Sequence, residues 1–154
     1  MLVKTGKITD GIFFHLQSTV LFRNFFTKKT RAPLTGAPAT RRLKTYSAQS
    51  GYVYQYYYEG NRPLRGSEGG AEFVFTVSAD RKTWAAVSVL LGDDAVREWE
   101  RTHARQLSST ERYAIAKMAL FQAFDERANP DLMKSEVRVR NADIESILET
   151  LGLD

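Results

Sequence analysis

The sequence AEFVFTVS, residues 71–78, predicts a β-strand from which the rest of the fold can be worked out. Its large side chains alternate, so that Phe73, Phe75 and Val77 share one face of an extended chain. Turn-forming sequences lie on both sides of it, EGNRPLRGSEGG before and ADRKT after. This pattern is typical of a strand that packs one face against a core.

Further strands are predicted on both sides of this one. Residues 45–58 and residues 84–91 have strand composition, and three short strands separated by turns indicate an antiparallel meander. The sequence SEVRVR, residues 135–140, alternates Val137 and Val139 with arginines, as a half-buried strand does. The sheet is therefore predicted to have three to four strands.

The sequence after residue 92 carries helix signals. A first helix is predicted from Asp93, whose side chain can cap it, to about Gln106. Val96, Trp99 and His103 fall on one stripe of this helix.

A second helix is predicted to start at the capping box SSTE, residues 108–111, and to run through Glu126, before Asn129-Pro130. It has little polar face, so we expect it to be the central buried helix. Asp125 lies with Glu126 at its C-terminal end, where the helix dipole disfavours negative charge. Surface ion pairs are predicted to neutralise these acids, with arginines as the partners: Arg127, Arg138 and Arg140.

A last helix is predicted to be capped by Asn141 and stopped by Gly152. Its apolar stripe has helical spacing: Ile144, Ile147, Leu148 and Leu151. Strands followed by helices, without regular alternation, indicate an α+β fold. The predicted domain, residues 45–154, is a mainly antiparallel sheet packed on one face by two to three helices.

Positive charge is concentrated near the N-terminus. Residues 1–50 contain nine Lys and Arg against one acid, Asp10, whereas the rest of the chain has a net charge of −4. Residues 27–45 have few large apolar side chains and no acid, which predicts a linker or flexible arm. The apolar run of residues 11–26 is interrupted by polar residues and is too short to span a bilayer. Residues 1–44 are predicted to be a basic, poorly ordered extension. The open alternatives are an organellar or export leader and a packed helix or interface-lying segment.

The sequence SGYVYQYYYEG, residues 50–60, has five tyrosines within seven positions. The tyrosines at alternate positions from Tyr52 to Tyr58 share one face of an extended chain. They could form the packed face of a strand, a platform on which nucleotide bases stack, or part of a pocket for a protein or a small ligand. The strand carries no basic residue, and Glu59 is its single charge, which favours the packed strand.

Most kinds of catalytic chemistry have no signature in this sequence. There is no cysteine, and the usual metal, phosphate-loop and dinucleotide motifs are missing, so no metal or cofactor is expected. His103, with Glu100 one turn before it, is the single candidate for a general base. The alternative is a histidine that packs on its stripe or interacts with the helix dipole.

The predicted function is a non-enzymatic binding or assembly module that self-associates through residues 137–140 if they form an edge strand. The first alternative is a nucleic-acid-binding protein that uses the N-terminal arm and the arginines of the turns. Its predicted contacts are basic or aromatic: Arg41, Arg42, Lys44, Arg62, Arg65, Arg81, Lys82, Tyr54 and Tyr56. The second alternative is a small hydrolase or ligand-binding domain. The expected partner is a second copy or another protein, and the expected compartment is the cytoplasm.

Overall fold

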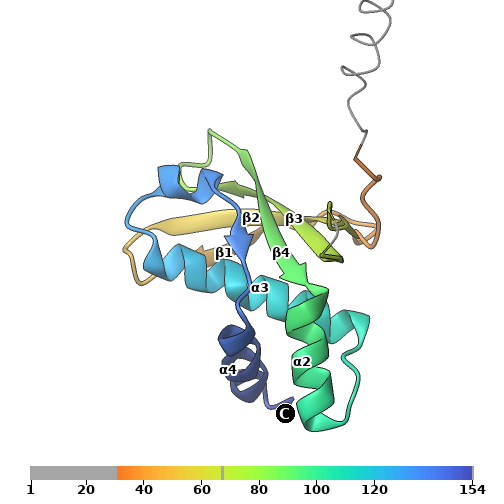
Figure 1. Cartoon of the computed structure of the whole chain (residues 1–154). Coiled ribbons are helices and arrows are strands. Elements are labelled where there is room, and N and C mark those ends of the chain that lie inside the picture. The colour runs from red at the N-terminus through yellow and green to blue at the C-terminus, as the bar shows by residue number, and fades with distance from the viewer. Residues whose placement is uncertain (1–30, 67, 154) are drawn as a thin grey trace, which may run out of the picture. The chain divides into compact units, whose positions relative to one another are not determined.

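The computed structural model describes residues 31–66 and 68–153, and the expectations for residues 1–30 lie outside them. The elements follow in the order β1 (Lys44–Ser47), β2 (Val53–Pro63), β3 (Gly70–Ser78), β4 (Ala85–Gly92), α2 (Asp93–His103), α3 (Ser109–Glu126), the 3-10 helix η2 (Pro130–Lys134), β5 (Val137–Arg138) and α4 (Asn141–Leu151) (Figure 1). Strands come first and helices follow, which confirms the α+β prediction. Ala32–Asp154 form one compact unit.

The sheet has five strands in the order β1-β2-β3-β4-β5, one more than the upper predicted number. The meander of β2, β3 and β4 is antiparallel as predicted, whereas β5 pairs with β4 in parallel. The additional strand arises because residues 45–58 form a hairpin instead of one strand. Gly51, with φ 92°, makes the turn possible, and its N–H donates to the carbonyl of Ala48.

Strand β2 continues to Pro63, through residues that were predicted to be a turn. A bulge at Gly60, with φ 121°, shifts the register and lets pairing with β3 resume. The backbones of Thr35 and Asn61 exchange two hydrogen bonds of 2.8 Å at this point. The segment that leads into β1 is therefore attached to β2 on the side away from β3, beyond the residues that pair with β1.

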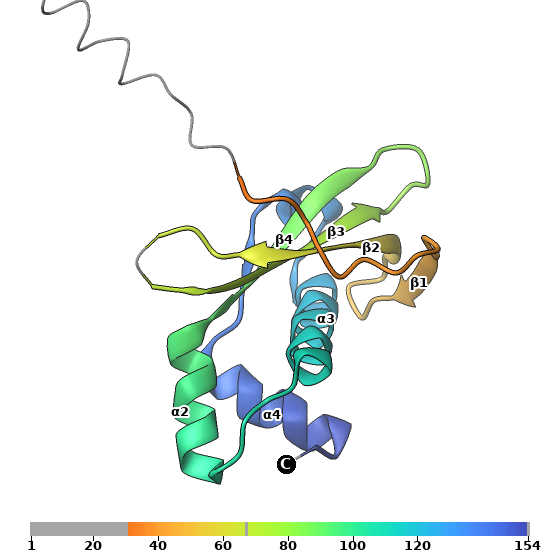
Figure 2. The same cartoon turned by 90° about the vertical axis from the view of Figure 1, so that its right-hand side faces the viewer.

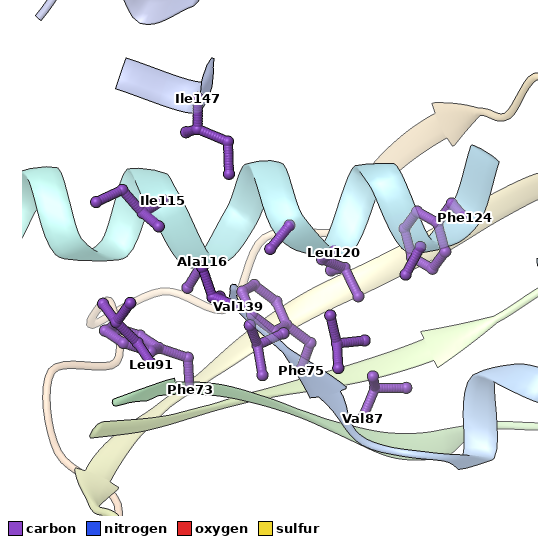
Figure 3. Packing of buried hydrophobic residues seen from close by; sticks show 14 of the residues in the cluster. Phe73, Phe75, Val87, Leu91, Ile115, Ala116, Leu120, Phe124, Val139 and Ile147 are labelled. Carbon is purple, nitrogen blue, oxygen red and sulfur yellow. The ribbon is translucent and has the colours of Figure 1, made fainter. Parts of the chain in front are cut away.

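The main core lies between the sheet and α3 (Figure 3). Phe73 and Phe75 project from β3 toward α3, as the alternation in AEFVFTVS predicts, and both are buried. Helix α3 is also covered on its other side, where Ile147 of α4 packs. The helix without a polar face is therefore the central buried helix, as predicted. Burial of each of these large apolar side chains, Phe73, Phe75 and Ile147, stabilises the fold by about 1.5–3 kcal/mol.

The helix ends agree only in part with the sequence signals. The capping box of Ser108 and the stop at Gly152, with φ 66°, are confirmed. The predicted caps of α2 and α4 are wrong, because the N-cap positions are Gly92 and Arg140. In α4 the carboxylate of Asp143 accepts from the Arg140 N–H at 3.1 Å.

The displaced cap residues have other places in the fold. The side chain of Asn141 hydrogen-bonds to Glu98 of α2, so it joins two helices instead of capping one. Asp93 is the first residue of α2, where its charge still suits the helix dipole. Helix α2 ends at His103, before the predicted Gln106, because Ala104 adopts a left-handed conformation with φ 49°.

Of the two acids at the end of α3, Glu126 interacts with a predicted arginine, because the pKa of Arg140 is raised mainly by Asp143 and to a lesser extent by Glu126. The other acid, Asp125, has different partners. Asp125 accepts a hydrogen bond from the Tyr46 hydroxyl and another from the Gln49 N–H, both at 2.8 Å. The Ser50 hydroxyl donates to the carbonyl of Phe124 at 2.7 Å. The β1–β2 hairpin therefore caps the C-terminal end of α3.

Arg127, one of the predicted partners, donates to backbone carbonyls of the following loop, those of Leu132 and Ser135 at 2.8 Å each. Strand β5 lies at one edge of the sheet, as the self-association hypothesis requires, but it has only two residues. Among the described residues, no helix has the length and apolarity needed to cross a bilayer.

Candidate functional site

Two tyrosines of the β2 row are part of the core. Tyr54 is 0% exposed and Tyr56 is 3% exposed. The ring of Tyr54 stacks on Phe124 of α3, with 4.1 Å between the centroids. Both rings are packed in the core, as the packed-strand interpretation predicts.

Tyr57 lies on the other face of the sheet, away from the helices. The guanidinium of Arg41 sits 4.0 Å from its ring centroid, and Trp84 packs beside it at 5.4 Å. Arg41 also forms an ion pair with Glu59. Burial alone would raise the pKa of Glu59, but hydrogen bonds from Thr76 and Arg41 outweigh it and hold that pKa low.

Most other predicted nucleic-acid contacts are distributed over the structure. Arg62 is paired with Glu72, with 2.7 Å between Nε and Oε2, and Glu72 also accepts from the Ser88 hydroxyl at 2.7 Å. This buried pair on the sheet is structural. Arg65 lies in the β2–β3 connection. Arg81 and Lys82 lie in the β3–β4 turn.

Three of the predicted residues, Arg42, Lys44 and Tyr56, meet at one cavity of about 670 Å³. Its walls come from the segment 36–42, from β1, β2 and β3, and from the first turns of α3. We call it the β2-edge cavity. Its polar and aromatic lining side chains are Thr40, Arg42, Lys44, Tyr56, Tyr58, Asn61, Phe73, Ser109, Thr110 and Tyr113.

The cavity exists because of how the N-terminal segment joins the sheet. Residues 31–43, orange in Figure 2, lead across to β1 at the sheet edge. They touch β2 at the Thr35–Asn61 bridge and again where Lys44 pairs with Tyr56. Between these two attachments the segment does not pair with β2, and the cavity lies there.

The charge in the cavity is positive. Arg42 and Lys44 are the charged residues of the described lining, which includes no carboxylate. Lys117 on α3 neighbours Lys44, and its pKa is lowered first by burial and then by that second ammonium group. Neither lysine has an ion-pair partner among the described residues. Three cations therefore lie at or beside the cavity.

The first turn of α3 adds hydrogen-bond donors. Ser108 accepts the N–H of Glu111, while the N–H groups of Ser109 and Thr110 have no partner within the helix. Both residues line the cavity and also carry hydroxyl groups. The N-terminal end of a helix holds partial positive charge, so this wall also favours an anion.

Aromatic rings form the remaining wall. Burial, with Tyr113 close by, raises the pKa of Tyr56 to about 12, so its hydroxyl stays a proton donor. Within the described part of the chain, nothing accepts a hydrogen bond from that hydroxyl. The hydroxyl of Tyr58 accepts from the Asn61 side chain at 3.0 Å. Burial also raises the pKa of Tyr58.

The predicted catalytic pair is not brought together. Nδ1 of His103 contacts the Trp99 carbonyl at 3.0 Å, and Nε2 lies 3.2 Å from Glu145 of α4. The ring also stacks on Trp99, with 4.2 Å between the centroids. Glu100 instead accepts from the Leu107 N–H at 2.9 Å. The described residues hold no cluster of side chains suited to a metal ion.

Sequence reasoning missed several residues in or beside the cavity. Tyr113 and Lys117 belong to α3 and were read as parts of a buried helix, and Asn61 was placed in a turn. Ser109 and Thr110 were recognised only as part of a cap. No sequence motif joins these positions to Arg42, because they meet through the packing of α3 on the sheet. No family model, curated protein or solved structure matches this chain.

Proposed function

We propose that this chain is a binding module that holds a small organic anion with an aromatic or apolar body in the β2-edge cavity. One observation carries the proposal: the described lining combines Arg42 and Lys44 with three tyrosine rings and contains no carboxylate. This agrees with the binding role expected from the sequence and makes no use of His103.

The size and chemistry of the cavity support this proposal. A volume of about 670 Å³ lies within the range of about 300–1,000 Å³ that is usual for small-molecule sites. Such sites combine apolar walls with a few polar groups that orient the ligand. Here Phe73 and the tyrosine rings provide the walls, while Arg42, Lys44 and the start of α3 provide the orienting groups.

The test uses two fluorescent probes that differ in one group. 8-Anilinonaphthalene-1-sulfonate has an aromatic body and a sulfonate, whereas N-phenyl-1-naphthylamine has the same body without the charge. We expect saturable binding of the sulfonate probe by the whole chain, and weaker binding of the neutral probe. Added salt should weaken the first and leave the second unchanged, because salt screens exposed charges.

Substitutions test whether the sulfonate probe binds in the β2-edge cavity. Lys44→Gln and Arg42→Gln should each weaken binding of the sulfonate probe, whereas Lys82→Gln, the same change in a distant turn, should not. Circular dichroism should show that all three variants are folded. If the two probes bind equally, or if Lys82→Gln is as harmful as Lys44→Gln, the proposal is wrong.

Single-stranded nucleic acid is a second candidate ligand, at a different surface. Trp84 is 38% exposed beside Tyr57, and Arg41 lies over the Tyr57 ring. Exposed rings next to arginine can stack bases at about 1–3 kcal/mol per base. Titration with oligothymidylate should quench Trp84 fluorescence in a salt-dependent manner, and Trp84→Ala should abolish binding. The absence of quenching at low salt would reject this candidate.

A further inference from the structure

We infer that the β2-edge cavity selects a phosphomonoester dianion, held between Arg42 and Lys44 on one side and the first turn of α3 on the other. This inference rests on the proposed function and names the anionic group of the ligand. It is argued from the charges, from an unpartnered donor and from the position of the nearest acids.

The first argument is the amount of positive charge. Lys44 and Lys117 lie side by side, and Arg42 lines the same cavity. Two neighbouring ammonium groups repel one another unless an anion lies near both. The partial charge of the α3 N-terminus adds to theirs. A carboxylate or sulfonate would neutralise one of these cations, whereas a phosphomonoester brings close to two negative charges at neutral pH.

The second argument is the number of donors. Tyr56 is 3% exposed and lines the cavity, yet in the described residues no group accepts its hydroxyl proton. Among the described residues, the buried polar atoms without a partner are the Tyr54 hydroxyl oxygen and Trp99 Nε1, whereas the Tyr56 hydroxyl opens on the cavity and is free to donate to a ligand there. Ser109 and Thr110, at the start of α3, also line the cavity and contribute N–H and hydroxyl groups. A phosphoryl group has three terminal oxygens to accept these bonds, one more than a carboxylate has.

The third argument is that the nearest acids are already engaged. On α3, Glu111 accepts from the Ser108 N–H and from Arg105, both at 2.7 Å. On β2, Glu59 is paired with Arg41. The titratable groups that line the cavity are therefore two cations and three phenols: Arg42, Lys44, Tyr56, Tyr58 and Tyr113. The described lining has no histidine or acid that changes charge between pH 5 and pH 8.

The experiment compares three ligands with one aromatic body: 1-naphthyl phosphate, 1-naphthalenesulfonate and 1-naphthoate. Their dissociation constants for the whole chain are measured by displacement of the anilinonaphthalene probe. At pH 7.5 we expect the phosphate to bind about tenfold more tightly or better, the effect of one further charge-assisted contact. This advantage should disappear toward pH 5, because the phosphate loses its second charge near pH 6.

Variants assign the selectivity to the cavity. Lys117→Gln and Lys44→Gln should each reduce the preference for phosphate over sulfonate, and Tyr56→Phe should weaken phosphate binding without altering the fold. Lys82→Gln is the matched control and should change nothing. If the sulfonate and the phosphate bind equally at pH 7.5, the inference is wrong although the proposed function stands. If none of the three ligands binds, both are wrong.

Discussion

Replacement of Asp125 by alanine tests how the β1–β2 hairpin is held on α3. Asp125 accepts one hydrogen bond from Tyr46 and one from Gln49. A hydrogen bond to a charged group contributes about 1.5–3 kcal/mol, and the low end applies here because the site is partly exposed. Removing an acid from the C-terminal end of a helix returns about 0.5 kcal/mol. The net loss should therefore be about 2.5 kcal/mol, since two bonds of about 1.5 kcal/mol are lost and one repulsion of about 0.5 kcal/mol is relieved.

The assay is urea unfolding followed by tryptophan fluorescence, with an unchanged m-value as the sign that the unfolding reaction is the same. A loss of about 2.5 kcal/mol should lower Tm by about 8–12 °C in a unit of this size. Glu126→Ala is the matched control. Glu126 is the next acid on the helix, is exposed, and makes no hydrogen bond among the described residues, although its charge interacts with Arg140. Its removal should leave stability unchanged or raise it by about 0.5 kcal/mol.

A double-mutant cycle isolates the bond to Tyr46. Tyr46→Phe alone should cost about 1 kcal/mol. Combined with Asp125→Ala, it should cost less than the two single changes together, by about 1 kcal/mol. If Asp125→Ala is no more harmful than Glu126→Ala, or if the cycle shows no coupling, the hairpin does not cap α3 through this carboxylate.

Three further predictions concern separate parts of the fold. Ser108→Ala should lower the unfolding free energy by about 1 kcal/mol through loss of the helix cap, while Ser108→Thr should retain most of it, both measured by urea unfolding. Asp80 should titrate by NMR with a pKa of about 2, below its ordinary 3.8, because the Thr83 N–H donates to its carboxylate. Its contribution to stability should therefore be present above about pH 4 and lost as the pH falls toward 2, and an NMR midpoint near 3.8 would contradict this. Gly60→Ala should expose the segment before β1 to limited proteolysis, because a Cβ there would lie 2.6 Å from the Thr35 carbonyl; an unchanged cleavage pattern would count against the bridge.

The tyrosines of β2 show which features the alternation of residues along a strand can predict and which it cannot. Alternation alone placed Tyr54 and Tyr56 on one face and Tyr57 on the other, and the structure has this arrangement. Pattern did not reveal the turn at Gly51, because strand composition continues on both sides of it. The helix ends were also predicted only in part. The capping box correctly identified Ser108 as an N-cap. Asn141 is a residue type that often caps helices, but its side chain bonds to another helix.

The candidate site was predictable only in its separate pieces. The sequence indicated that Arg42, Lys44 and Tyr56 could contact a nucleic acid. It did not indicate that they line one cavity. Tyr113 and Lys117 were unrecognised, because on a helix they look like ordinary core and surface residues. Their role depends on which part of the sheet α3 packs against.

The amino-acid sequence by itself determined the strand and helix periods, the buried faces and the central place of α3, since these follow from the spacing of apolar side chains along a short piece of chain. Only the tertiary structure decided that Asp125 receives the hairpin, that β5 joins the sheet in parallel, and that a positive cavity lies between residue 35 and β1. The physical reason is that such contacts join positions tens of residues apart. Their partners are selected by how elements pack in space, and the periodicity of one segment carries no information about its neighbour.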